Sequence, residues 1–234
     1  MSKGKLYLIP NFLGESDINT ILPSNVLSVI NTIEEFIVED EKAARYLLKK
    51  AGIKRPLQEV KLHLLNEHTD PKSIKHYLTA IEQGFNIGLI SEAGCPSVAD
   101  PGAEIVKLAH KNDIKITPLI GPSSILLALM ASGLNGQNFC FNGYLPKEQT
   151  ERIKKIKMLE KLVKSTNQTQ LFIEAPYRNT HLLNDILANC DSQTNLCIAC
   201  NITCADEFIK TRSVYEWNQQ KPDIHKKNTI FLLG

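Results

Sequence analysis

The stretch from residue 86 to residue 102, NIGLISEAGCPSVADPG, combines the residue types of a ligand-binding loop. Gly94 and Gly102 permit backbone angles, or a close approach of a ligand, that a side chain would forbid. Glu92 and Asp100 bring carboxylates to the two ends of the loop. Because loops at the carboxyl ends of parallel strands commonly bind small molecules, the sequence predicts a site here. The alternative interpretation is a tight strand-to-helix connection in which Asp100 caps the helix.

Polar or special residues recur at the same position in the pattern, just past the end of a strand-like segment. The residues concerned are Asn11, Glu39, Asn66, Glu92 and Ser123. Each of them alone is typical of a turn or a helix cap. In a parallel sheet, however, the carboxyl ends of the strands meet at one rim, and the recurrence therefore favours a shared pocket.

The elements that must position this rim alternate between strand and helix. Short apolar runs predict strands at residues 5–9, 36–38, 60–65, 87–90 and 114–120. Apolar residues at helical spacing predict helices at residues 26–33, 43–51, 72–83, 103–110 and 125–132. This alternation predicts an α/β fold whose N-terminal parallel sheet has flanking helices.

The second half of the chain has fewer predicted helices and more strands. Strands are expected at residues 139–144, 170–173, 196–203 and 230–233, with a less certain one at 207–211. This pattern of predicted strands and helices indicates a C-terminal α/β domain with a mixed sheet. We place the two domains at residues 1–118 and 119–234.

An amphipathic helix at residues 151–164 is the most basic segment of the chain. Its apolar positions are expected to face inward, and Arg152 and the lysines mostly outward. A solvated helix face is the default interpretation, and contact with a phosphate backbone is the alternative.

Composition excludes several classes of protein. The 234 residues carry a formal charge of +2, and this balance does not by itself indicate a nucleic-acid binder. No apolar run approaches the roughly 20 residues of a membrane span, and the start of the chain lacks the pattern of a signal peptide. We therefore expect a cytoplasmic protein without a membrane partner.

Cysteines near the C-terminus raise the question of a metal site. Cys197, Cys200 and Cys204 are spaced C-x2-C-x3-C, which could ligate zinc or an iron–sulfur cluster. The segment reads as a strand, however, and residues three apart on a strand point to opposite faces. No histidines form a helical H-x3-H pair either, so no metal is expected.

Four motifs in fixed order then identify a family. LISEAGCPSVADPG, PLIGPSSILLALMASGL, FNGYLPKE and FIEAPYRN resemble the family of ribosomal small-subunit methyltransferase I, within the tetrapyrrole methylase superfamily. The resemblance spans nearly the whole chain. It implies two α/β domains, S-adenosylmethionine in the cleft between them, a homodimer and no metal. The cofactor-binding positions carried over are Phe12, Gly14, Ala93, Gly94, Cys95, Val98, Ser123, Ser124, Glu174 and Ala175.

The chain also departs from the family's motifs. Phe12 stands where the family's first loop, PIGN, has its proline, and the acidic motif EDTR reads Glu39-Asp40-Glu41-Lys42. Glu92 replaces an aspartate and Cys95 a threonine. These changes affect the expected substrate role more than the cofactor role, because residues that would meet RNA have changed.

The reaction that the resemblance implies is 2′-O-methylation of a cytidine ribose in small-subunit ribosomal RNA. A carboxylate would take the hydroxyl proton, and Glu39, Asp40 and Asp100 are the candidates. Phosphates would be bound by Lys42, Arg45 and Arg178, and Tyr177 would stack on a base. Two alternatives stay open: methylation of a tetrapyrrole or other small molecule, and a non-catalytic module that binds the cofactor. A dinucleotide-binding oxidoreductase is disfavoured because no G-x-G-x-x-G follows the first strand.

Overall fold

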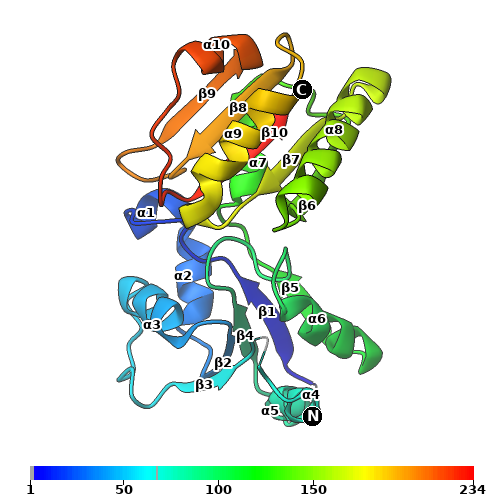
Figure 1. The fold of residues 1–234 in the computed structure, drawn as a ribbon. Helices are drawn as coiled ribbons and strands as arrows, with labels where there is room; N and C mark the ends of the chain where they lie inside the picture. Colours follow the sequence, from blue (N-terminus) through cyan, green and yellow to red (C-terminus); the bar gives the residue numbers. More distant parts are fainter. Residues whose placement is uncertain (1–2, 67) are drawn as a thin grey trace. The chain divides into compact units, whose positions relative to one another are not determined.

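The computed structural model describes residues 3–66 and 68–234, which form two sheets flanked by helices (Figure 1). Contacts divide the chain into a unit that runs to Ser123, here the N-terminal unit, and a C-terminal unit, Ser124–Gly234. The predicted α/β class is confirmed. The domain boundary at residue 118 stays a prediction.

The N-terminal unit contains a five-stranded sheet with the order β3-β2-β4-β1-β5. Every pair of neighbouring strands in it is parallel, as the sequence predicted. The strands are β1 (Lys5–Ile9), β2 (Glu35–Val38), β3 (Lys61–Leu64), β4 (Ile87–Ile90) and β5 (Lys115–Pro118).

Alternating side chains of this sheet enter two separate cores. Phe36 and Val38 of β2 pack into one core and Ile37 into the other, because successive side chains of a strand point to opposite faces. The first core includes residues from α1 (Ile18–Ile21), α2 (Ser24–Ile30) and α3 (Glu41–Lys50). The second includes residues from the helical segment before β4 and from α6 (Gly102–Lys111).

The helical segment before β4 differs from the continuous helix predicted at residues 72–83. It consists of α4 (Pro71–Ile74), the 3₁₀ turn η1 (Lys75–Leu78) and α5 (Thr79–Glu82). The break leaves the apolar face in place, because Leu78 and Ile81 are both buried in the same core and Ile74 packs against it. Leu78 and Ile81 lie four and seven positions after Ile74, as on an α-helix, so the apolar period was predicted correctly and the continuity of the helix was not.

The order of the strands creates a topological switch point between β1 and β4. The chain leaves β1 toward β2, on one side of the pair, whereas it leaves β4 toward β5, on the other side. In open parallel sheets the carboxyl ends of such a pair are the usual place for a ligand. The loops after β1 and β4 therefore lie where a ligand is expected.

The C-terminal unit holds a second five-stranded sheet with the order β6-β7-β10-β8-β9. Its first pair is parallel and the others are antiparallel, which confirms the predicted mixed sheet. The strands are β6 (Phe139–Tyr144), β7 (Thr169–Ile173), β8 (Asn195–Cys200), β9 (Phe208–Ser213) and β10 (Thr229–Leu233).

Helices cover both faces of this second sheet (Figure 1). One face shares a core with α8 (Gln149–Thr166), α9 (Asn179–Asn189) and α10 (Val214–Gln219). On the other, α7 (Ser124–Ser132) packs against β9 and β10. Helix α10 was not predicted from the sequence, although Ser213 and Glu216 form a capping box at its start.

One prediction about α8 is wrong. Arg152 was expected to face solvent with the lysines, but its side chain is buried. It lies on the same helical face as Ile156 and Leu159, four and seven residues further on, and both of these are in the core. Among the residues that the structure describes, no helix is long and apolar enough to span a membrane.

Candidate active site

Asn11 fastens the loop after β1 to the loop after β4. Its backbone N–H donates to the carbonyl of Gly94 over 2.9 Å, and the N–H of Gly94 donates back over 3.2 Å. The side-chain amide Nδ2 donates to the carbonyls of Ser91 and Glu92, each over 3.0 Å. Asn11 is only 2% exposed. This residue, expected at the rim as a polar side chain, thus holds the rim together.

Gly94 is required by the shape of this junction. Its φ of +68° is a conformation that side chains disfavour. A Cβ added there would lie 3.3 Å from Cδ2 of Leu13, closer than an ordinary contact. The hydroxyl of Ser91 donates to the carbonyl of Gly94 over 3.2 Å, which links the two ends of this turn. A neutral turn rich in backbone groups results.

Asp100 closes the far end of the loop. Its carboxylate accepts the backbone N–H of Ser97, over 2.8 Å to Oδ2, and that of Gly102, over 2.7 Å to Oδ1. Asp100 is not the N-cap of α6, because Pro101 occupies that position and no side chain caps it. It instead accepts the N–H of Gly102, the first residue of the helix. Asp100 also imposes a compact turn on residues 97–102.

Strain accompanies this compact turn. Ser97 and Ala99 adopt φ angles of +69° and +62°, a region that residues other than glycine rarely enter. The Ser97 hydroxyl oxygen is buried and has no hydrogen-bond partner in residues 3–66 and 68–234. Strained backbone and an orphaned polar atom concentrate at functional loops more than at plain connections.

Four carboxylates gather at this rim. Oε2 of Glu39, which follows β2, accepts the backbone N–H of Glu92 over 3.0 Å. Burial raises the pKa of Glu39, and the charges of Asp100, Glu92 and Asp40 raise it further, although the bond from Glu92 opposes them. Burial likewise raises the pKa of Asp100. The rim therefore favours a cationic ligand, and Glu39 is the carboxylate best prepared to take a proton.

Asp40 has a different function in the structure. Its carboxylate accepts the backbone N–H of Ala43 over 2.7 Å and caps α3. Asn66, which was also expected at this rim, accepts the N–H of His68 and is engaged in its own turn. The structure thus brings together Asn11, Glu39 and Glu92 from the predicted set.

The predicted cofactor positions of the N-terminal unit differ in exposure. Phe12 is buried in the core, where its ring meets that of Tyr46 edge-on, so only its backbone can face a ligand. Ala93 and Val98 are exposed. The Cys95 thiol donates to the carbonyl of Pro122 over 3.4 Å, which ties the loop to the residue before Ser123.

The expected phosphate-binding residues are not equally available. Lys42 is exposed on α3. Arg45 instead donates from Nη1 to the carbonyl of Leu57 over 2.8 Å and lies 3.6 Å from Glu41. Its guanidinium already supports the segment that leads to β3.

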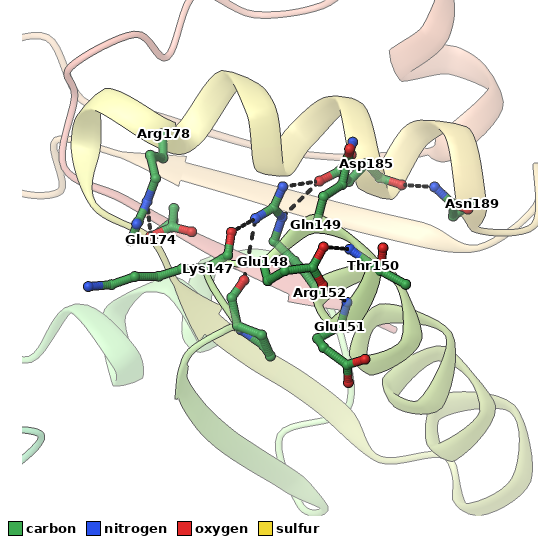
Figure 2. Close-up of polar contacts among 11 residues, drawn as sticks. Lys147, Glu148, Gln149, Thr150, Glu151, Arg152, Glu174, Arg178, Asp185 and Asn189 are labelled. Atoms are coloured by element: carbon green, nitrogen blue, oxygen red, sulfur yellow. Dashed lines mark hydrogen bonds and ion pairs between the residues drawn. The ribbon is translucent and has the colours of Figure 1, made fainter.

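The motif FIEAPYRN follows β7 in the C-terminal unit. Glu174 is only 4% exposed, and its Oε1 accepts a hydrogen bond from the N–H of Ala175. The same oxygen accepts from the guanidinium of Arg178 (Figure 2). Its Oε2 is buried without a partner in the described part of the chain. Arg178 also lies over the ring of Tyr177, 5.4 Å from the centroid.

Two further predicted cofactor positions, Gly14 and Ser124, are partly exposed.

No group of three or more His, Cys, Asp and Glu side chains in the described residues is arranged to hold a metal ion. Cys200 belongs to the core under α9, whereas Cys197 pairs in register with Thr211, whose hydroxyl donates to Ser132 of α7. The two cysteines therefore point to opposite faces, as predicted.

A candidate ligand loop at a switch point, followed by a mixed-sheet unit, is an arrangement found in α/β enzymes that bind small molecules. Residues 22–217 match the family Tetrapyrrole (Corrin/Porphyrin) Methylases. The chain belongs to this family and is therefore a methyltransferase.

Relatives agree with this assignment. "Ribosomal RNA small subunit methyltransferase I" of Escherichia coli O157:H7 is 28% identical over 99% of this chain and 78% of its own length. The protein of that name from Buchnera aphidicola subsp. Schizaphis graminum is 30% identical over 98% and 78%. The solved methyltransferase CobJ superposes with a TM-score of 0.66 at 16% identity, covering 99% of this chain and 94% of its own. The cobalt precorrin-4 methyltransferase CbiF gives 0.61 at 15%, covering 98% and 94%.

Proposed function

We propose that this protein uses S-adenosylmethionine to methylate the 2′-hydroxyl of a cytidine ribose in small-subunit ribosomal RNA. The observation that carries the proposal is the strained, backbone-rich loop at residues 91–102, fastened by Asn11 at the switch point. The names of the relatives, found over nearly the full chain, support the substrate class. Such a substrate would place the enzyme in the cytoplasm, and we propose that it acts as a homodimer.

The chemistry of the rim fits the cofactor. S-adenosylmethionine supplies an electrophilic methyl group on a cationic sulfonium, and its methionine part carries an ammonium group. The carboxylates of Glu39, Glu92 and Asp100 give the rim the opposite sign. The neutral turns offer backbone donors and acceptors without phosphate-binding cations. The residues that would hold the cofactor are Phe12 (through its backbone), Gly14, Ala93, Gly94, Cys95, Val98, Ser123, Ser124, Glu174 and Ala175.

Glu39 is our candidate for the general base. Its raised pKa strengthens it as a proton acceptor, and Oε1 accepts no hydrogen bond from any residue that the structure describes. The backbone N–H groups that Asp40 and Asp100 bind occupy those two carboxylates, which makes them weaker candidates. Lys42 is free to contact phosphates, whereas Arg45 would have to leave Leu57.

Calorimetric titration with S-adenosylmethionine and its demethylated product tests the cofactor assignment. We expect micromolar binding to the wild type and at least tenfold weaker binding to Gly94→Leu, because the side chain would fill the turn. Gly133→Leu is the matched control, since Gly133 has a similar φ of +71° but open space around it. No binding to the wild type would overturn the proposal.

The acceptor is tested separately with small ribosomal subunits that lack the modification. Methyl transfer from radiolabelled cofactor, followed by nuclease digestion and mass spectrometry, should yield a 2′-O-methylated cytidine. A methylated base, or turnover only on a tetrapyrrole, would contradict the substrate half of the proposal and leave the methyltransferase class intact.

A further inference from the structure

Two exposed tyrosines mark a surface of the C-terminal unit. Tyr144, at the end of β6, is 62% exposed, and Tyr177, just after β7, is 61% exposed. A tyrosine joins a large apolar ring to a polar hydroxyl, so exposed tyrosines that lie near one another suit a surface where a partner docks. We call these two rings, with Lys147, Arg178 and Lys226, the strand-end surface.

The topology of the sheet brings these residues to one place. β6 and β7 are parallel neighbours, and Tyr144 pairs in register with Ile173, the last residue of β7. The loops after the two strands therefore start side by side. The backbone N–H of Lys226 donates to the carbonyl of Pro176 over 3.0 Å and brings a third segment to the same edge.

Basic and acidic side chains are both present around the strand-end surface, and they differ in how they are paired. Lys147 and Lys226 are exposed and have no ion pair with any residue in the described ranges. Three acidic residues lie in the same segments, and two of them are engaged: Glu174 pairs with Arg178, and Glu148 caps α8. Asp223 is exposed and accepts the N–H of His225. Two unpaired cations thus stand beside two open rings.

A buried ion pair holds one of the loops in shape (Figure 2). Nη1 of Arg152 donates to the carbonyl of Lys147 over 2.7 Å and to that of Pro146 over 3.3 Å. The same guanidinium is fixed by Asp185 of α9. On the other loop, Arg178 lies over the Tyr177 ring and is itself bonded to Glu174. Both aromatic residues are therefore presented by ordered backbone.

We infer that the strand-end surface binds single-stranded RNA, with Tyr144 and Tyr177 stacking on bases and Lys147 and Lys226 contacting phosphates. Exposed rings and cations in neighbouring segments suit single strands, because every unpaired base offers a π-face and every nucleotide a phosphate. A membrane would call for larger aliphatic groups beside the lysines. This inference rests on the proposed function and names the part of the protein that holds the RNA around the target.

Fluorescence anisotropy with a short labelled RNA of mixed sequence tests the inference. Tyr144→Ala and Tyr177→Ala should each weaken binding by about tenfold, the usual loss for one stacked base. Lys147→Ala and Lys226→Ala should each lower the slope of log affinity against log salt by about 0.7. A duplex of the same sequence should bind more weakly, because its base faces are hidden.

Controls within the same unit separate a defined surface from general attraction. Tyr215→Ala removes a ring that is exposed on α10, and Lys210→Ala removes an exposed lysine of β9. Both should bind RNA like the wild type. Equal losses in the control and test variants, or equal binding of duplex and single strand, would overturn the inference. Calorimetry with S-adenosylmethionine distinguishes failure of this inference from failure of the proposed function. If the wild type binds the cofactor but the tyrosine variants bind RNA normally, only the strand-end surface is refuted.

Discussion

The guanidinium of Arg152 and the carboxylate of Asp185 form a buried ion pair that joins α8 to α9 in the C-terminal unit. Nε and Nη2 of Arg152 lie 2.7 Å and 2.6 Å from Oδ2 of Asp185, and each side chain is 8% exposed. Gln149 donates to the other carboxylate oxygen over 2.9 Å. With the bonds to the loop after β6, the network satisfies nearly all the hydrogen-bonding capacity of both charges, which is the condition for a charge to be tolerated in a core.

Removing one partner of this pair should destabilise the protein strongly. We expect Arg152→Ala to lower the free energy of unfolding by about 3–5 kcal/mol, because Asp185 would be left buried without compensation. Urea denaturation followed by circular dichroism measures the change. Lys154→Ala, which breaks the exposed pair with Glu151, should cost less than about 1 kcal/mol. The double variant Arg152→Met/Asp185→Leu should recover most of the loss, and a double variant as unstable as the single one would contradict this account.

Asn11 should be essential to the loop at residues 91–102. Asn11→Ala leaves the carbonyls of Ser91 and Glu92 without their donor, which costs about 1–3 kcal/mol in a buried site. Hydrogen exchange measured by mass spectrometry should become faster in residues 91–102. Asn19→Ala removes an exposed amide bonded to Asp17 and serves as the control, with a change within about 0.5 kcal/mol. Unchanged hydrogen exchange in residues 91–102 of the Asn11 variant would show that the loop keeps its structure without the Asn11 side chain.

The sequence predicts the strands well because each is a short apolar run bounded by turn residues. The prediction that Arg152 faces solvent is wrong, although the helical period places this residue on the buried face of α8. Arg152 occupies the position four residues before Ile156, on the buried face, and Asp185 stands directly before Ile186 of the core of α9. Hydrophobicity alone assigns an arginine to the surface. An ionisable residue at a core position on each of two helices is the signal that would have revealed the pair.

The candidate site was predictable in place and less so in detail. Asn11, Glu39 and Glu92 converge because parallel strands end at one edge, and that rule needs only the order of the elements. The left-handed angles of Ser97 and Ala99 have no local signal, since neither residue type favours them. They are imposed by Asp100, which bonds across the turn, so only the three-dimensional structure reveals them.

The C-terminal cysteines should bind no metal and react slowly. Burial raises the pKa of Cys190 to about 12 and also raises the pKa values of Cys197 and Cys200. Metal ligation and alkylation both require the thiolate, which burial disfavours. We expect less than stoichiometric zinc by elemental analysis, and iodoacetamide should modify partly exposed Cys204 before these three. Zinc retained at one ion per chain would refute the prediction.

The raised pKa of Glu39 makes a prediction about stability and pH. The folded state holds the Glu39 proton more tightly than the unfolded chain, in which the pKa is near its ordinary value of 4.5. This contribution to stability is therefore present below pH 4.5 and is lost as the pH rises through the folded-state pKa. Glu39→Gln keeps an oxygen for the N–H of Glu92 but removes the titration. The difference in free energy of unfolding between the variant and the wild type should therefore shift in favour of the variant as the pH rises from below 4.5 to neutral.

The same substitution, Glu39→Gln, should lower the rate of methyl transfer. If Glu39 takes the hydroxyl proton, Glu39→Gln should slow methyl transfer by roughly 10²–10⁴-fold, while calorimetry still detects cofactor binding. In the wild type, the rate should fall as the pH drops through the raised pKa of Glu39, and the variant should lack this limb. Glu82→Gln, an exposed change on α5, is the control for both measurements. A variant with wild-type rate and pH profile would remove Glu39 as the base and leave its carboxylate as a support for the loop at Glu92.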